Sequence, residues 1–268
     1  MHDKIGICYY TKEKNFGDVL NEYIPLQLFN CNIYKENVYQ CDAAFIGSIL
    51  NPFVTNDSLK IREDLTPLKI WGSGLIRPID LKNKPIRKLD IRAVRGRLTR
   101  NILSVITNSN LSTIPLGDPG LLCSRVFTNL DSTKEYEYGI IPHYIDVDNE
   151  NLKKLQLPNS IILDITEEPI AFLSKMLKCK KIISSAMHGL IAADSFNIPN
   201  IRMILSDNIV GGDFKYNDYY SAFGFDHHEK LDLRTYNGVI TNLKFKYKIT
   251  PRQVESIQNA LIRSFPYA

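Results

Sequence analysis

The chain has 268 residues, 44% of them hydrophobic, and carries 33 Lys and Arg against 29 Asp and Glu. This length can bury a substantial core, and a net charge of +4 is too small to indicate a nucleic-acid partner. No apolar run approaches the roughly 18 residues of a membrane span, and the first residues, MHDKIGICYY, lack the apolar core of a secretory signal. We therefore expect a cytoplasmic protein.

Short apolar runs alternate with amphipathic runs, which predicts strands and helices in turn. Expected in the first part are strands over Lys4–Tyr10, Ala43–Ile49, Leu68–Trp71, Ile91–Val94 and Thr113–Leu116, and helices over Asp18–Phe29 and Leu98–Val105. After the polar, linker-like run Phe127–Glu137, the pattern predicts strands over Tyr138–Ile141, Ser160–Asp164, Ile182–Ile183 and Ile201–Leu205, and helices over Pro169–Leu177, Leu190–Ile198 and Thr250–Phe265. The fold class is therefore α/β, with two Rossmann-like halves, residues 1–130 and 131–249, facing a cleft in a GT-B-like arrangement.

The loop Thr11–Gly17 is long for a connection between a strand and a helix. Long loops at this edge of a sheet are often functional. We expect Asn15, Gly17 and Asp18 to face the cleft and contact a sugar or a phosphate. For Asp18, a role as the helix N-cap is an equally good explanation.

Polar residues also follow the later strands of the first half. Ser73 lies in the turn Gly72-Ser73-Gly74, which lacks the spacing of a dinucleotide fingerprint and is predicted only as a cleft residue. Asp118 before Pro119 is typical of a helix start. Arg95 leaves a buried strand, where an arginine has no packing role, so it either binds a ligand carboxylate or phosphate or pairs with a neighbouring Asp.

Positive charge is concentrated in one segment. Between Arg77 and Arg100, nine Lys or Arg stand against Asp80 and Asp90. This composition fits a solvated face, or a surface that meets phosphates or lipid head groups.

Two histidines come directly after predicted strands of the second half. His143 follows Tyr138–Ile141, and His188 lies in the turn Ala186–Gly189 between a buried strand and a helix. Ligands of open α/β sheets bind at the carboxyl ends of strands, and the first turn of the next helix offers unpaired N–H groups to an anion. His188 is therefore expected at the mouth of the cleft, with Gly189 letting a ligand approach the backbone.

No metal site is expected. The five cysteines are scattered and form no Cys-x-x-Cys pair. His227 and His228 lie in a polar run, and adjacent His side chains seldom chelate one ion. The aromatic run Phe214–Phe225 fits either a sugar-stacking surface or a helix that buries its aromatic side chains.

Five segments resemble the polysaccharide pyruvyl transferase family, in the family's order. They are NFGDVLN (Asn15–Asn21), WGSGLI (Trp71–Ile76), RAVRGRLTRNIL with LGDPGLL (Arg92–Leu103 and Leu116–Leu122), YGIIPHYID (Tyr138–Asp146) and SSAMHGLIAADSFNIPNIRM (Ser184–Met203). The last segment is similar to the branch that has Ala-Met-His-Gly, with Ala186 where other members have an Arg.

This resemblance implies phosphoenolpyruvate as the donor, no cofactor, and a cyclic pyruvate ketal on two sugar hydroxyls as the product. It also implies that the final helix, within residues 250–268, crosses back onto the first half. A donor with a phosphate and a carboxylate needs cations and N–H groups, for which Arg95, Gly189, Arg202 and Lys215 are the candidates.

We expect His188 to be the acid/base, because imidazole gives and takes protons near neutral pH, with His143 and Arg95 orienting the donor. The family suggests a lipid-linked saccharide acceptor, and hence peripheral contact with the inner membrane face. Two alternatives remain open on the same architecture: a glycosyltransferase that uses a nucleotide sugar, and a non-catalytic saccharide-binding domain.

Overall fold

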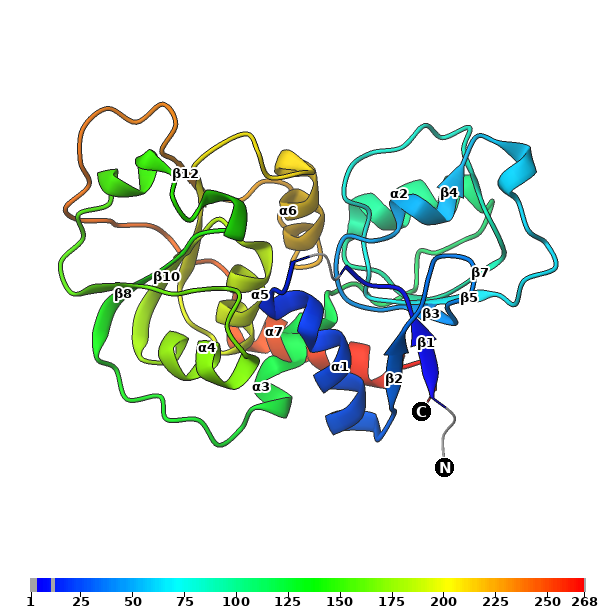
Figure 1. The fold of residues 1–268 in the computed structure, drawn as a ribbon, viewed down its shortest axis with the longest axis horizontal. Helices are drawn as coiled ribbons and strands as arrows, with labels where there is room; N and C mark the ends of the chain where they lie inside the picture. The colour runs from blue at the N-terminus through cyan, green and yellow to red at the C-terminus, as the bar shows by residue number, and fades with distance from the viewer. Residues whose placement is uncertain (1–3, 11–12, 268) are drawn as a thin grey trace.

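The structure is a computed structural model that describes residues 4–10 and 13–267, so residues 1–3, 11–12 and 268 of the segments named above lie outside it. Two five-stranded parallel sheets dominate the fold, as the ribbon in Figure 1 shows. The first sheet has the order β2-β1-β3-β5-β7, and the second has the order β12-β11-β10-β8-β9. The predicted α/β class with Rossmann-like parallel sheets is confirmed.

The elements have the following bounds. The first sheet contains β1 (Ile5–Ile7), β2 (Ile33–Lys35), β3 (Ala43–Ala44), β5 (Leu68–Trp71) and β7 (Leu89–Ala93). The second contains β8 (Tyr136–Ile141), β9 (Ser160–Ile162), β10 (Cys179–Ser184), β11 (Asn200–Ile204) and β12 (Lys230–Asp232), while β4 (Val54–Thr55) and β6 (Lys84–Pro85) form a small antiparallel pair. The α-helices are α1 (Phe16–Phe29), α2 (Arg97–Ile106), α3 (Cys123–Val126), α4 (Pro169–Met176), α5 (Met187–Ser195), α6 (Gly212–Ser221) and α7 (Pro251–Arg263).

Several elements differ in extent from their predictions. The expected strand Thr113–Leu116 is reduced to one bridge, between Leu116 and Val94. The helix after β10 begins at Met187, three residues earlier than predicted, because Ala186 adopts the extended N-cap conformation. His188 therefore lies in the first turn of α5 and not in the loop before it.

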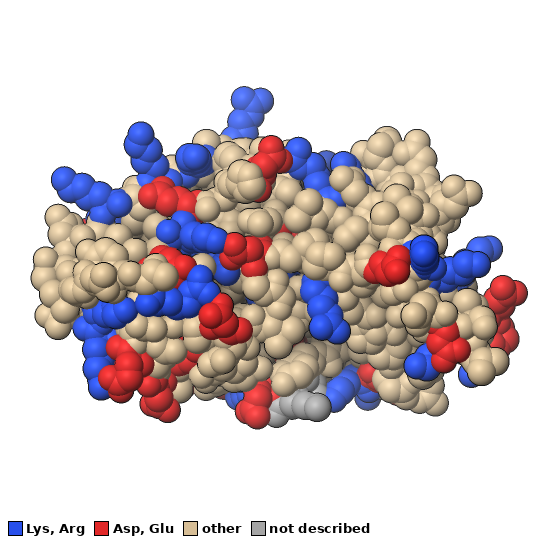
Figure 2. Space-filling view, turned by 90° about the horizontal axis from the view of Figure 1, so that it is seen from above, with Lys and Arg blue, Asp and Glu red and all other residues tan. Residues whose placement is uncertain are grey.

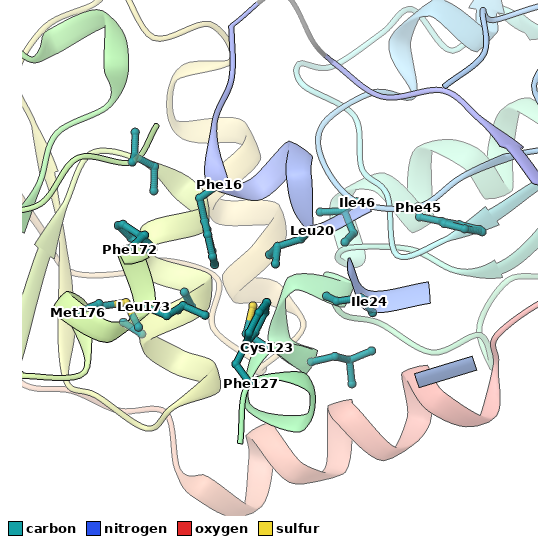
Figure 3. Packing of buried hydrophobic residues seen from close by; sticks show 14 of the residues in the cluster. Phe16, Leu20, Ile24, Phe45, Ile46, Cys123, Phe127, Phe172, Leu173 and Met176 are labelled. Atoms are coloured by element: carbon teal, nitrogen blue, oxygen red, sulfur yellow. The ribbon is translucent and has the colours of Figure 1, made fainter. Parts of the chain in front are cut away.

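One apolar core extends through both sheets, and α1 lies in its middle. Figure 3 shows Phe16, Leu20 and Ile24 of α1 pointing into this core. The Phe16 ring lies 4.7 Å from the Phe172 ring of α4, on the side of the second sheet. Asn15 caps α1 by accepting a hydrogen bond from the backbone N–H of Asp18, so the cap that was considered for Asp18 belongs to Asn15.

The last helix, α7, follows the second sheet in the sequence but packs on the first. The Trp71 indole at the end of β5 donates a hydrogen bond of 2.9 Å to the Leu261 carbonyl. Phe265 stacks on Phe29 of α1 with 3.8 Å between ring centroids. No helix among the described residues is long and apolar enough to cross a membrane.

Leu261 offers a test of this packing, because its side chain is fully buried in the shared core. Leu261→Ala should lower the free energy of unfolding by about 2–5 kcal/mol, since it leaves a cavity between α7 and the first sheet. Urea denaturation measures this change. Glu255→Ala, at an exposed position of the same helix, should change stability by less than about 0.5 kcal/mol. Equal effects of the two variants would contradict the packing described.

Candidate functional site

A cavity of about 280 Å³ opens where the carboxyl ends of strands from both sheets meet. Its walls include residues that follow β1 and β3 of the first sheet and residues that follow β8 and β10 of the second. The polar and titratable side chains of interest are Asn15, Asp18, His143, His188 and Lys215. Five of the predicted site residues are thus brought together at one place.

His188 is held between the two sheets. A Cβ atom on Gly17 would lie only 1.8 Å from Nδ1 of His188, so the ring rests directly on the backbone of α1. The His188 side chain is 13% exposed. Burial, followed by the positive charge of Arg95 and Lys215, lowers the pKa of His188 to about 3. The imidazole is therefore neutral in the free protein.

Asp118 lies behind His188. Its Oδ2 is 3.9 Å from Nε2 of His188, and its Oδ1 accepts a 2.9 Å hydrogen bond from the backbone N–H of Gly120. The predicted role of Asp118 as a helix N-cap is confirmed, for a 3₁₀ turn over Pro119–Leu122. Burial raises the pKa of this carboxyl to about 6. Its place beside His188 was missed, because the Asp-Pro pattern was fully explained by capping.

Asp18 adds a second carboxyl to the cavity wall. Burial raises its pKa to about 7, and the nearby charge of Asp118 adds to this, while a hydrogen bond from Asn15 opposes it. A carboxyl that titrates near neutral pH can both hold and release a proton under ordinary conditions. Asp18 is therefore a candidate proton carrier as well as a polar contact.

Lys215 is the only Lys or Arg among the described residues that line the cavity. It projects from α6, and within the described part of the chain it has no carboxylate or hydrogen-bond partner, only the face of the Tyr216 ring at 5.3 Å. Burial, Arg95 and Arg202 lower the pKa of Lys215 to about 7. An unpaired buried cation of this kind is suited to an anionic ligand.

The start of α5 supplies N–H donors beside Lys215. The N-cap residue Ala186 has no polar side chain and makes no capping hydrogen bond. The first-turn amides of a helix lack acceptors within the helix and attract anions. Ala186, Met187 and His188 line the cavity. The Ala186 N–H donates to Ser184 Oγ and the Gly189 N–H to the Ala186 carbonyl, so among the described residues the first-turn amides without an acceptor are those of Met187 and His188.

His143 occupies the same wall, after β8. Its Nδ1 accepts a 3.3 Å hydrogen bond from the backbone N–H of Ile145, so the proton of the neutral ring is on Nε2. Burial lowers the pKa of His143 to about 4, and the charge of Lys215 contributes. His143 is thus a neutral hydrogen-bond donor rather than a cation.

Arg95 does not line the cavity. Its side chain is fully buried and forms an ion pair of 2.9 Å with Asp218 of α6, while other guanidinium N–H groups donate to Leu75 and Ser48. Of the two alternatives for Arg95, the structure shows the one in which it pairs with an Asp. Its positive charge still reaches His188 and Lys215 and lowers their pKa values.

Three other predicted residues also lie away from the cavity. Arg202 forms an ion pair of 2.7 Å with Asp213 and lines a separate cavity beyond α6. Gly189 is needed for packing instead of ligand approach, because a Cβ there would lie 2.6 Å from Oγ of Ser184. Ser73 is buried, and its hydroxyl donates to the Phe45 carbonyl.

The aromatic run and the basic segment also have structural explanations. Tyr216, Tyr219 and Tyr220 are buried on α6, so the helix conceals its aromatic side chains. In the basic segment, Arg87 is buried, and three further arginines pair with Asp: Arg92 with Asp90, Arg95 with Asp218 and Arg97 with Asp226. On the face shown in Figure 2, Lys and Arg are mixed with Asp and Glu. The described residues contain no cluster of His, Cys, Asp and Glu that could hold a metal ion.

The protein is thus an α/β protein in which two Rossmann-like sheets share a polar cavity that holds an imidazole, a lysine and a helix N-terminus. Residues 7–208 match the sequence model of the polysaccharide pyruvyl transferase family. The chain belongs to this family. It is also 31% identical, over 235 residues, to an uncharacterized protein of Acanthamoeba polyphaga mimivirus, an alignment covering 83% of this chain and 76% of that protein.

The contact between Gly17 and His188 yields a prediction. Gly17→Ala places a methyl group where the imidazole now lies, so the ring must move away from the cavity wall. We expect a loss of activity of at least about tenfold, because displacements near 1 Å can cost up to about a hundredfold. Helix propensity alone would favour Ala by about 1 kcal/mol. A fully active and more stable Gly17→Ala variant would contradict the contact.

Proposed function

We propose that this protein transfers pyruvate from phosphoenolpyruvate to two hydroxyls of one sugar and forms a cyclic pyruvate ketal. Family membership supports pyruvyl transfer, and one arrangement supports the donor: Lys215, which has no carboxylate partner among the described residues, faces the same cavity as His188. The reaction as proposed needs no cofactor. The two sheets would then correspond to the halves of a GT-B-like enzyme.

The donor carries a phosphate of about −1.5 to −2 charges near pH 7 and a carboxylate. Lys215 supplies a cation for one of these groups, and the first-turn amides of α5 supply N–H donors. Nε2–H of His143 offers a further hydrogen bond. Arg95 contributes through its charge alone, since its guanidinium is buried.

His188 is the proposed acid/base. Binding of the anionic donor raises the pKa of the imidazole, which then gives its proton to the methylene carbon of the enol. The first sugar hydroxyl adds to the neighbouring carbon and transfers its proton to a base, for which Asp18 is placed in the same wall. The second hydroxyl then displaces inorganic phosphate, and its proton leaves with the phosphate or returns to His188.

The acceptor is proposed to be a saccharide linked to a lipid, met at the inner face of a membrane. Exposed apolar side chains stand at the cavity wall, namely Tyr10, Ile145 and Val210. Such side chains suit the apolar face of a sugar ring or the first part of a lipid chain. They support an acceptor that approaches from the open side of the cavity.

His188→Gln tests the acid/base assignment. We expect turnover to fall by about 10²–10⁴-fold, because Gln can donate a hydrogen bond but cannot carry the proton. Donor binding should persist: phosphoenolpyruvate at a hundred times its dissociation constant should stabilise both wild type and variant by about 2.7 kcal/mol. Product is measured by mass as a pyruvate ketal on the saccharide.

Stabilisation by ligands, measured as a shift in melting temperature, also separates the proposed function from the two alternatives. A protein that is stabilised by a nucleotide sugar and not by phosphoenolpyruvate would be a glycosyltransferase. Stabilisation by saccharide alone, with no product of any kind, would indicate a binding domain. A His188→Gln variant with full turnover would contradict the assignment of the proton transfer.

Lys215 predicts the pH dependence of donor binding. Its lowered pKa of about 7 means that the free protein loses this positive charge as the pH rises through 7. The affinity for phosphoenolpyruvate should therefore fall above pH 7, by about tenfold per pH unit at the limit. Lys215→Arg stays charged and should remove this loss of affinity. Calorimetric titration at pH 6.5, 7.5 and 8.5 measures the affinity of both proteins for phosphoenolpyruvate. The same dependence of affinity on pH in wild type and Lys215→Arg would contradict the role of Lys215.

A further inference from the structure

The buried Nε2 of His188 faces Oδ2 of Asp118. We propose that Asp118 is a positioning residue for His188, accepting the Nε2–H of the imidazole so that Nδ1 is the nitrogen that exchanges a proton with the substrate. This inference rests on the proposed acid/base role of His188. It adds which ring nitrogen carries the hydrogen and which residue determines this.

The first support is a pair of buried polar atoms, one on each residue. Oδ2 of Asp118 and Nε2 of His188 are both buried and 3.9 Å apart, and within the described part of the chain neither has a partner at hydrogen-bond distance, although the Gly47 backbone N–H also lies near the carboxylate. Leaving a buried polar atom unpaired costs about 1–3 kcal/mol, so each gains from the other. Hydrogen bonds of catalytic groups are often long in free enzymes and shorten when substrate binds.

The second support is that neither residue can easily turn away. The backbone N–H of Gly120 holds Oδ1 of Asp118, which leaves Oδ2 directed at the ring. The imidazole lies on Gly17 at its Nδ1 edge, while its Cδ2 atom is 3.6 Å from the position of a Cβ on Gly120. Gly17 thus leaves the space that the ring fills, and in this position Nε2 is the nitrogen on the side of Asp118.

The third support is the charge that the reaction creates. Burial raises the pKa of Asp118 to about 6, so the carboxyl remains mostly ionised at neutral pH. A carboxylate beside Nε2 stabilises the imidazolium that forms when Nδ1 takes a proton. The proton moves only between substrate and Nδ1, and the bond from Nε2 to its hydrogen is retained throughout.

A purely structural role for Asp118 predicts a different result. If Asp118 served only as the cap of the turn Pro119–Leu122, Asp118→Asn would leave the tautomer and kcat unchanged, because Asn and Asp are equally good N-caps. Asn keeps an oxygen for the Gly120 amide but turns an NH₂ group toward Nε2 of His188. That group can only donate, so the ring must carry its proton on Nδ1 instead.

The test is the tautomer of His188 in the free protein, read from long-range ¹H–¹⁵N correlation spectra of protein with ¹⁵N-labelled histidine. The signals of His188 are identified by their loss in His188→Gln. We expect the Nε2–H form in wild type and the Nδ1–H form in Asp118→Asn. We also expect the kcat of Asp118→Asn to fall by roughly 10²–10⁴-fold, with donor affinity changed less than about twofold.

Asp194→Asn is the matched control. Asp194 is fully buried on the same helix as His188, and its pKa is also raised to about 6, but it accepts hydrogen bonds from Tyr219, Tyr247 and Asn200. This variant should lower the melting temperature and leave His188 in the Nε2–H form.

Two results would overturn the inference: an Nδ1–H form in wild type, or an Asp118→Asn variant with unchanged tautomer and kcat. If Asp118→Asn does not fold, the wild-type spectrum alone decides. The spectrum is recorded without substrate. A donor or product other than the proposed one would therefore contradict the proposed function but would leave the tautomer of His188 established.

Discussion

The site depends on one steric condition: the imidazole of His188 lies against Gly17, a backbone position of α1 without a side chain. This contact joins the second sheet, which carries His188, to the helix that lies in the middle of the shared core. The apolar side chains of α1 hold the helix in the core, and the helix backbone at Gly17 holds the imidazole of His188 in place. Packing in the core thereby determines the position of the His188 imidazole, around which the other polar residues of the cavity are arranged.

Burial also explains the electrostatics. The pKa values of His188 and Lys215 are lowered, and those of Asp18 and Asp118 are raised, so all four groups shift toward their neutral forms. The free cavity is therefore less charged than its composition indicates. In the proposed function, a donor with a phosphate and a carboxylate would supply the missing negative charge and make protonation of the imidazole and the amine favourable. The substrate thus completes the charge balance on which the proposed proton transfer depends.

Local sequence patterns were sufficient for the alternation of strands and helices and for the placement of His143 and His188 at strand ends. They were insufficient where a partner lies far along the chain. Arg95 meets Asp218, which is 123 residues away, so no local pattern could decide between a ligand and an internal partner. Asp118 fits the local pattern of an N-cap, so no local pattern indicated that it also lies beside His188. Gly17 was predicted as a cleft residue, but the reason for a glycine is visible only when His188 is placed beside it.

The buried ion pair between Arg95 and Asp218 joins the segment after β7 to α6, and a Cβ on Gly96 would lie only 1.7 Å from the Asp218 carbonyl oxygen. Removing one partner of such a buried pair costs about 3–5 kcal/mol, because the other charge is left buried without compensation. The pair and the close backbone contact at Gly96 therefore hold the segment after β7 against α6 at a point that does not line the cavity.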